Sequence, residues 1–471
     1  MLESCRGTRN MDRISNLPNE IICHIGSFIS AKEAAFTTVL SKRWRNLLTI
    51  IPKLHYDGLV DDEGSFEDFF DGLLAIPVST RIRTLSLKCN HMAQYDEHIN
   101  RCLCEVVKRG AMVLELQIEV AKEGSYSLPL EIFTCKTVEK MELGSGFAID
   151  FIPADALIPA LKTLSLDSVL FYNDFGGGCA FQALVSASPV LEELVMDGIE
   201  WERWRWSWAV SSPTLQRLTI QRQVWDSNER YGNSNNVLDS RGLAYDFDSI
   251  SLDAPSLTYL EYSDYVPKEY PIVNLNSLVE AKLDLRVDQD SIWGGEHAED
   301  FDPMNMVNGL KNVEILDLTI ETMVMLYVYR EALPVFGNLF QVSVSLSSYC
   351  WYSLPILIAK SPNLKTLIIE DSDHCVDEKA LVCVCQCVSE TSDVLSSSLE
   401  VLNITGYRGT MGELVVLMEH FLGKLACLQL VEVHARVSGG DEKLKVLSDL
   451  LMLPRVSSKC KIQVKFSPKR Y

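Results

Sequence analysis

A short apolar pattern recurs along most of this 471-residue chain and limits the folds open to it. One apolar residue is followed by two variable residues, a second apolar residue, one variable residue and a third apolar residue. The last two apolar positions are two residues apart, so each unit predicts a short strand with one buried face. Fourteen such units begin at Ile51, Ile82, Val113, Val138, Leu161, Leu191, Leu215, Leu257, Leu278, Val313, Leu339, Leu364, Leu399 and Leu428.

The units start about 29 residues apart on average, which is the period and pattern of a leucine-rich repeat. We therefore predict an α/β repeat fold, an irregular leucine-rich-repeat solenoid (horseshoe) whose connecting segments are often helical. Proline stands two residues before several units, where it would end a helix and lead the chain into the strand. A parallel sheet of another α/β fold is the alternative, but it needs fewer and more regular strands.

The chain is strongly acidic, with a net charge of −21 that is unevenly distributed. Residues 1–58 hold eight Lys/Arg and five Asp/Glu, so the acidity lies in the rest of the chain. An acidic body argues against a nucleic-acid partner and against an anionic membrane surface. Since no apolar run has the length of a signal peptide or a membrane span, we expect a protein of the nucleus or cytoplasm with its 14 cysteines reduced.

The N-terminal segment from Leu17-Pro18-Asn19-Glu20 to Ser41-Lys42-Arg43-Trp44-Arg45 predicts three short amphipathic helices. About 40 residues bury too little apolar surface to be stable alone, so another protein or the rest of the chain must cover them. These residues resemble the plant F-box, which binds the Skp-type adaptor of SCF (Skp–cullin–F-box) ubiquitin ligases. The resemblance implies that the adaptor-facing residues are Leu17, Pro18, Ile21, Ile25, Val39 and Trp44.

Two residues depart from the usual F-box pattern: Gly26 replaces a large apolar residue, and Ser30 stands where proline is common. Glycine inside a helix costs roughly 1 kcal/mol against alanine, which would weaken adaptor binding. The alternative is a helical cap that shields the first repeat. The C-terminal region, with Ser396-Ser397-Ser398-Leu399 and Leu453-Pro454-Arg455-Val456, resembles the plant FBD region. We thus expect a flexible terminus at 1–11, an F-box at 12–58, repeats at 59–385, and FBD-like terminal repeats with a cap at 386–471.

No catalytic motif is present in the sequence: there is no P-loop, no Gly-rich dinucleotide fingerprint, no H-E-x-x-H and no Gly-x-Ser-x-Gly. The cysteines form no C-x-x-C pair, so no zinc RING is encoded. Cys383, Cys385 and Cys387 alternate, but no histidine joins them at ligand spacing, which favours packing over a metal site. We expect a protein that is not an enzyme and that has no catalytic residue, metal or cofactor.

The variable strand positions of the repeats form a face that the pattern predicts to be acidic. Taking three such positions in each of the units beginning at residues 82 to 399 gives eleven acidic and four basic residues. A phosphorylated target would need clustered arginines, so we expect a basic or neutral target, bound by residues such as Glu193, Glu261 and Asp317. The acidic residues are Glu115, Glu119, Glu142, Asp167, Glu193, Asp197, Glu261, Glu280, Asp284, Asp317 and Glu370, and the basic residues are Lys88, Lys140, Arg217 and Lys282.

Two further segments stand out between the repeats. The polar run 226–236 predicts a mobile surface loop. The tryptophans at 201, 204, 206 and 208 either form a partner-binding cluster or pack inside the outer layer of a repeat.

Two functions fit these features. The first is a non-catalytic substrate-recognition subunit of an SCF-type ubiquitin ligase, which binds the Skp-family adaptor through the F-box, through it a cullin, and a protein target through the repeats. Such a subunit acts by positioning, because it raises the effective concentration of target lysines near the donor thioester. The alternative is a repeat scaffold that binds partners without directing ubiquitination.

Overall fold

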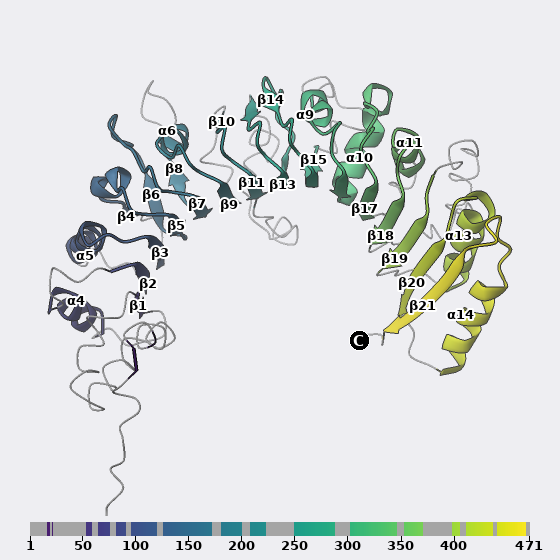
Figure 1. The fold of residues 1–471 in the computed structure, drawn as a ribbon, viewed down its shortest axis with the longest axis horizontal. Coiled ribbons are helices and arrows are strands. Elements are labelled where there is room, and N and C mark those ends of the chain that lie inside the picture. Colours follow the sequence, from purple (N-terminus) through teal and green to yellow (C-terminus); the bar gives the residue numbers. More distant parts are fainter. Residues whose placement is uncertain are drawn as a thin grey trace, which may run out of the picture. The chain divides into compact units, whose positions relative to one another are not determined.

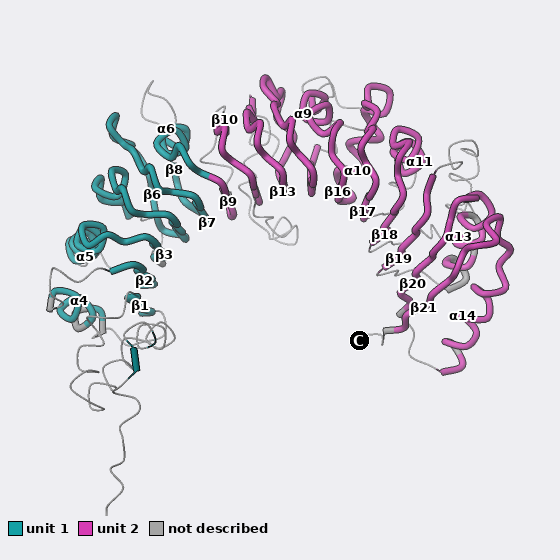
Figure 2. Tube along the Cα trace, viewed as in Figure 1, with its two compact units in different colours: residues 1–191 teal, residues 192–471 magenta. Residues whose placement is uncertain are grey.

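The computed structural model describes the repeats of the chain in detail and little of the N-terminal segment. Between residues 12 and 52 it describes only Leu17, Pro18 and Ile21. The described residues are 17–18, 21, 53–58, 65–75, 82–90, 96–119, 126–171, 180–199, 208–222, 249–287, 302–345, 353–370, 398–405, 411–436 and 440–467. The chain forms two compact units, residues 1–191 and 192–471 (Figure 2).

Unit 1 is built on a parallel sheet with the strand order β1–β2–β3–β5–β7. Each strand pairs with the strand of the next repeat, and Leu54, Leu85 and Leu114 occupy equivalent positions on β1, β2 and β3. Among the described residues, the segments after β1, β2 and β7 each contain a helix and the segment after β3 contains a 3-10 helix. A small parallel sheet, β4–β6–β8, is also formed by the connecting segments. The elements are β1 (Lys53–Asp57), α4 (Ser65–Ala75), β2 (Thr84–Asn90), α5 (Asp96–Lys108), β3 (Val113–Glu119), β4 (Tyr126–Ser127), η3 (Leu130–Thr134), β5 (Lys140–Leu143), β6 (Phe147–Ile149), β7 (Thr163–Asp167), β8 (Leu170–Phe171) and α6 (Ala180–Ser186).

Unit 2 continues the same design, with a parallel sheet in the order β9–β11–β13–β15–β16–β17–β18–β19–β20–β21 and a small sheet β10–β12–β14. The helices α10, α11 and α13 lie together on one side of its strands (Figure 1). The strands are β9 (Glu193–Ile199), β10 (Trp208–Ser211), β11 (Arg217–Arg222), β12 (Ile250–Asp253), β13 (Tyr259–Tyr265), β14 (Val273–Asn274), β15 (Glu280–Arg286), β16 (Ile315–Leu318), β17 (Gln341–Ser345), β18 (Thr366–Glu370), β19 (Val401–Thr405), β20 (Leu430–Arg436) and β21 (Lys461–Ser467). The helices are α9 (Met304–Gly309), α10 (Ile320–Val328), η6 (Arg330–Ala332), α11 (Ser353–Ala359), α13 (Met411–Lys424) and α14 (Gly440–Met452).

The strands alternate between buried and solvent-facing side chains, as the sequence pattern predicts. In β13, Leu260 and Tyr262 are fully buried, whereas Tyr259, Glu261 and Ser263 are half-exposed. Because the registers align like positions of successive repeats, the buried side chains stack into one apolar layer within each unit. This arrangement confirms the α/β leucine-rich-repeat fold.

A turn before the strand explains the prolines that precede several repeats. The N–H of Leu191 donates to the carbonyl of Ser188, and Leu364 donates in the same way to Ser361. Pro189 and Pro362 therefore occupy the second position of a four-residue turn, where the fixed φ of proline is favourable. Leu161 and Leu257 close the same turn around Pro159 and Pro255. Pro189 and Pro362 follow helices α6 and α11 and lead the chain into the strand, as predicted, whereas Pro159 and Pro255 stand in the same turn with no described helix before them.

Two details of the predicted repeat array are wrong. The third unit begins at Ala111 and not at Val113, because Leu85 pairs with Leu114 and Leu87 with Leu116. Val113 is half-buried on the solvent-facing side, while the small Ala111 fills the buried position. The prediction also missed β21, whose Ile462 and Val464 align with Val431 and Val433 of β20.

Candidate target-binding face

The candidate site is the solvent-facing side of the sheet in unit 2, from β9 to β18. The registers place Glu261, Lys282 and Asp317 in one row across β13, β15 and β16. Neighbouring strands are about 4.8 Å apart, so these three side chains are adjacent. Glu280 and Glu370 lie on the same face, on β15 and β18. We call Glu261, Glu280, Asp317 and Glu370, with Lys282 among them, the acidic middle.

The pKa of the Asp317 carboxyl group is raised above its ordinary value. Burial raises the pKa of Asp317, and the neighbouring carboxylates of Glu370, Glu261 and Glu280 raise it further, although Lys282 lowers it. The pKa of Lys282 is also raised, first by Tyr259 and, against the effect of burial, by Glu261 and Asp317. This part of the face therefore holds more negative charge than its own bases neutralise, which favours a cationic group from outside.

Glu261 and Glu193 already have partners within the unit. Gln221 Nε2 donates to Glu261 Oε1 at 2.9 Å, and the Tyr259 hydroxyl donates to Oε2 at 2.8 Å. Arg217 lies 3.6 Å from Glu193 and stacks on the ring of Tyr259, with 4.0 Å between its guanidinium carbon and the ring centroid. Because the Arg217–Glu193 pair is half-exposed, it contributes little stability, about 0–1 kcal/mol. It does reduce the net charge that Glu193 presents.

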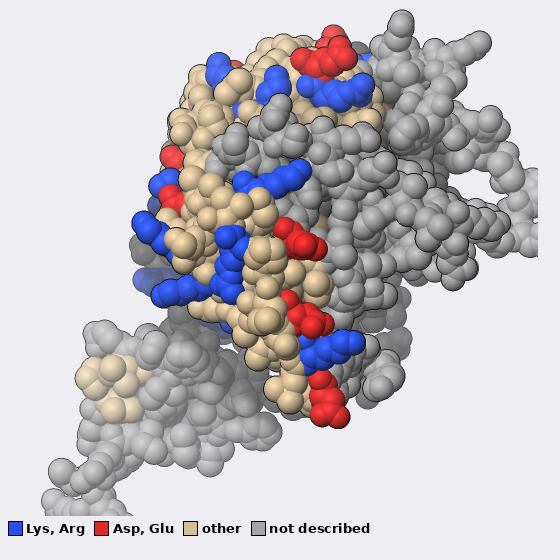
Figure 3. All heavy atoms as spheres, turned by 90° about the vertical axis from the view of Figure 1, so that its right-hand side faces the viewer, with Lys and Arg blue, Asp and Glu red and all other residues tan. Residues whose placement is uncertain are grey.

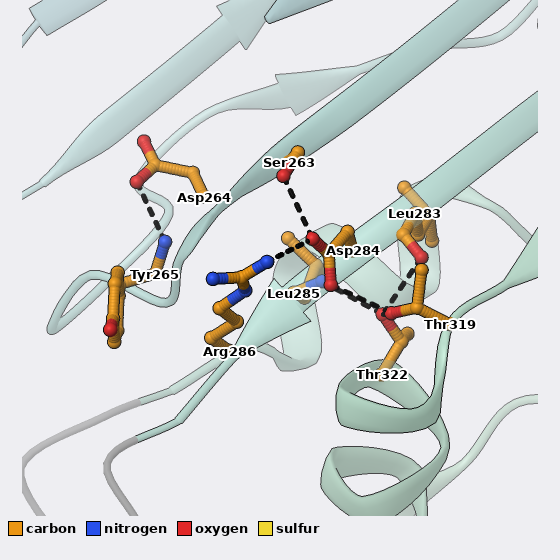
Figure 4. A network of polar contacts seen from close by, with 9 residues as sticks. All are labelled: Ser263, Asp264, Tyr265, Leu283, Asp284, Leu285, Arg286, Thr319 and Thr322. Atoms are coloured by element: carbon orange, nitrogen blue, oxygen red, sulfur yellow. Dashed lines mark hydrogen bonds and ion pairs between the residues drawn. The ribbon is translucent and has the colours of Figure 1, made fainter. Parts of the chain in front are cut away.

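Asp284, another predicted acidic residue of this face, has a structural role (Figure 4). Its carboxylate accepts hydrogen bonds from Ser263 Oγ at 2.9 Å, Arg286 Nη2 at 2.7 Å and Thr319 Oγ1 at 2.8 Å. Burial alone would raise the pKa of Asp284, but the hydrogen bonds from Arg286 and Thr319 outweigh it and hold the pKa below its usual value. Asp284 thus remains charged and ties β13, β15 and the start of α10 together.

The same network completes the end of β15, where β16 is too short to pair with it. α10 begins directly after β16, and its first turn takes the place of the missing strand residues. Thr322 Oγ1 accepts from the Leu285 N–H at 2.7 Å and donates to the Leu283 carbonyl at 2.9 Å. The Thr319 N–H also donates to Leu283. These buried backbone groups are satisfied by side chains instead of a neighbouring strand.

The three residues predicted to bind a target, Glu193, Glu261 and Asp317, lie on one face of unit 2. They are not one compact cluster: β11 separates Glu193 from Glu261, and β15 separates Glu261 from Asp317. The sequence pattern missed Arg286 because only three positions per repeat were considered, whereas β15 extends to a fourth. Apolar residues continue to alternate as far as Leu285, which indicates a longer strand and could have identified Arg286.

Of the predicted F-box segment 12–58, the structure describes Leu17, Pro18, Ile21 and the residues 53–58 that hold β1. The N–H of Ile21 donates to the carbonyl of Pro18 at 3.1 Å, as expected where a helix opens. Leu17 is half-buried, Pro18 is exposed, and Ile21 is 44% exposed. The remaining predicted adaptor-binding residues, Ile25, Val39 and Trp44, lie outside the described residues, as do Gly26 and Ser30.

Several other predictions concern residues that are not described: the polar run 226–236, the alternating cysteines 383–387 and the tryptophans at 201, 204 and 206. Trp208 begins β10. Among the described residues, no group of three or more His, Cys, Asp or Glu could hold a metal ion. In that same part of the chain no helix has the length and apolar character of a membrane span.

Comparison with known proteins places this architecture in a family. A model described as "F-box domain" matches residues 14–56, and one described as "FBD-associated F-box protein At5g56370, LRR repeats" matches residues 99–235. The F-box/LRR-repeat protein At3g62440 of Arabidopsis thaliana is 54% identical, over 96% of this chain and 100% of its own length. The chain belongs to the plant F-box/leucine-rich-repeat family.

Other members of the family give the same result. The putative F-box/LRR-repeat protein At5g15620 of Arabidopsis thaliana is 50% identical, over 97% of this chain and 100% of its own length. The F-box/LRR-repeat protein At3g58980 of the same plant is 49% identical, over 96% of this chain and 74% of its own length. The predicted resemblance is confirmed, and membership of the family supports a general role in substrate recognition by SCF-type ligases.

Proposed function

We propose that this protein is the substrate-recognition subunit of an SCF-type ubiquitin ligase. Residues 12–58 bind a Skp-family adaptor and, through it, a cullin, while the sheet face of unit 2 binds the protein target. The match of the F-box family model to residues 14–56 carries the adaptor half of the proposal. The exposed apolar side chain of Ile21 is consistent with a surface that a partner covers. The protein then works in the nucleus or cytoplasm, where such ligases assemble, and performs no chemistry itself.

The adaptor half is tested by co-purification of the full chain with a Skp-family adaptor. Trp44→Ala, and Leu17→Ala combined with Pro18→Ala, should each reduce adaptor recovery at least tenfold, because large desolvated side chains dominate such interfaces. Phe151→Ala is the matched control, since it removes a 62% exposed aromatic side chain of unit 1. Recovery that is unchanged in both F-box variants would leave the repeat scaffold without ubiquitination as the function.

The target half rests on the raised pKa of Asp317 and the excess of carboxylates around Lys282. A target segment bound there is basic or neutral and not phosphorylated, and its association weakens as salt screens the charges. Replacing Glu193, Glu261 and Asp317 together by Lys should slow association with the target and leave adaptor binding unchanged.

The control for this triple variant replaces three exposed acidic residues outside the face by Lys, so that the net charge of the protein changes by the same amount. Asp155, Glu269 and Glu331 are exposed and lie outside the strands that form the face. Their replacement by Lys should affect association much less. Equal slowing in both triple variants would mean that only net charge matters, and a target that requires phosphorylation would contradict the proposed face.

A further inference from the structure

The last strand of unit 2, β21, has a free edge in the part of the chain that the structure describes. β21 pairs with β20 in parallel, and no described strand pairs with its other side. The Lys461 N–H donates to the Gln429 carbonyl, so Lys461, Gln463 and Lys465 direct their backbone groups to β20. Ile462, Val464 and Phe466 therefore direct their N–H and C=O groups to the free edge. Such an edge is a template for another strand.

The apolar core is only half-closed at this edge. Val431, Val433 and Ala435 of β20 are fully buried, whereas the aligned Ile462, Val464 and Phe466 of β21 are half-exposed. In every earlier repeat of unit 2 a following strand covers these positions. At β21 a strand added from outside would do the same.

Helix α14, which connects β20 to β21, adds exposed apolar surface beside this edge. Leu444 is 68% exposed and Met452 is 82% exposed, and Leu451 and Val456 are also largely exposed. Lys443 of α14 lies over the ring of Phe466, with 5.8 Å from Nζ to the centroid, which places the helix against the apolar side of β21. These exposed apolar side chains, on and just after a helix that packs against the edge strand, add to the surface available to a partner.

The charge of this end is opposite to that of the chain. Residues 440–467 hold six Lys/Arg and three Asp/Glu, in a protein of net charge −21. Basic side chains gather along one side of the surface at this end (Figure 3). Lys461 and Lys465 are exposed on the solvent-facing side of β21, and Lys465 lies 3.5 Å from Glu432. We call residues 440–467 the basic end.

We propose that the basic end binds an extended segment of a partner protein in which acidic and apolar residues alternate. The segment adds to the free edge of β21 as a further strand. Its backbone pairs with Ile462, Val464 and Phe466, its acidic side chains lie beside Lys461 and Lys465, and its apolar side chains cover the half-open core. This site is independent of the F-box.

Charge complementarity selects this occupant over a second copy of the chain. Two copies joined edge to edge by a two-fold axis would place the lysines of β21 beside the lysines of the other copy. Like charges on adjacent strands are destabilising, and lysine on an edge is a common device against such pairing. An acidic segment makes the opposite contact.

The experiment measures the anisotropy of a fluorescent nine-residue peptide of alternating Glu and Val as the full chain is added at low salt. A peptide of alternating Lys and Val, and one with the same Glu and Val residues in blocks, are the comparison probes. We expect the alternating acidic peptide to bind at least tenfold more tightly than either. Equal binding of the block peptide would overturn strand addition in favour of simple charge attraction.

Two variants separate the backbone contact from the charges. Val464→Pro removes an N–H that faces the free edge while leaving the bonds to β20 in place, and edge strands tolerate proline there. It should abolish peptide binding, with Val464→Thr as the control that keeps the N–H. Lys461→Glu with Lys465→Glu should weaken binding at least tenfold, whereas reversal of the exposed Lys136 and Lys311 should not.

The mass of the protein in solution tests whether a second copy of the chain occupies the free edge of β21. We expect a monomer at the concentrations used, with or without peptide. A dimer that Val464→Pro dissociates would show that a second copy occupies the edge, and would overturn the proposal. Peptide binding that survives both Val464→Pro and the lysine reversal would overturn it as well.

Discussion

The acidic middle and the basic end of unit 2 are built on the same repeat but differ in how their polar groups are satisfied. In the middle, neighbouring strands lie on both sides, and Glu261 and Asp284 accept hydrogen bonds from the repeats beside them. At the end, β21 has a described neighbour on one side only, and its core side chains are half-exposed. Position in the array, more than local sequence, therefore decides which groups remain available to a partner.

Among the polar contacts near the acidic middle, the largest expected effect concerns Thr322, which satisfies buried backbone groups. Thr322→Val removes the acceptor of the Leu285 N–H and the donor to the Leu283 carbonyl. A buried group left without a partner costs about 1–3 kcal/mol, so the free energy of unfolding should fall by that amount in urea titrations. The control is Thr366→Val, a half-exposed position on the same face, which should change it by less than about 0.5 kcal/mol. Equal effects would show that the Leu285 N–H has another acceptor.

A smaller loss is expected from Asp284→Asn. The variant weakens the hydrogen bonds from Arg286, Thr319 and Ser263, at a cost of about 1 kcal/mol at neutral pH once solvent access is considered. Because the folded pKa of Asp284 is lowered, its charge stabilises the fold above the pKa of the unfolded chain, about 3.9, and this contribution disappears as pH falls through the folded value. The variant should therefore lose less stability than the parent between neutral pH and pH 3. A parallel loss in both would show that Asp284 is not the group that titrates.

Asp317→Asn should change the free energy of unfolding in the opposite direction from Asp284→Asn. Since the folded pKa of Asp317 is raised by burial and by Glu370, its charge is unfavourable above that pKa, and the penalty is relieved as pH falls through it. Removing the charge should raise the free energy of unfolding by up to about 0.5 kcal/mol at neutral pH, as for other half-exposed surface positions. Thermal unfolding of Asp284→Asn and Asp317→Asn, measured in the same series of buffers of different pH, checks both predictions. A destabilised Asp317→Asn would indicate that Lys282 outweighs the neighbouring carboxylates.

The repeat fold could be predicted from the sequence because the apolar spacing determines where each strand lies and which of its faces is buried. The prediction failed where a repeat departs from that spacing. Ala111 is too small to stand out, and at β21 the position that aligns with Leu428 is Lys459. The alternation of Lys461, Ile462, Gln463, Val464 and Lys465 still carried the signal of a strand.

The site was less predictable than the fold. The sequence placed the acidic residues on one face, but not which of them are tied into networks within the unit. Asp284 and Asp317 both occupy variable, solvent-facing positions of neighbouring repeats, yet their pKa values shift in opposite directions. The pKa of Asp284 is lowered first by the hydrogen bond from Arg286, two residues on in the same strand, and then by the one from Thr319, which precedes α10. The contact with Thr319 joins different repeats, and no local pattern encodes it.

The smallest expected effect lies at the basic end. Leu444→Ser combined with Met452→Ser removes two of its most exposed apolar side chains, 68% and 82% exposed. Surface changes of this kind alter stability by less than about 0.5 kcal/mol each, so urea unfolding should be almost unchanged. Leu450→Ala, on the buried side of the same helix, is the contrasting variant and should cost about 2–5 kcal/mol. A loss of several kcal/mol in the double serine variant would mean that these side chains already pack against the protein itself. The basic end would then be a closed cap and not a surface left open for a partner.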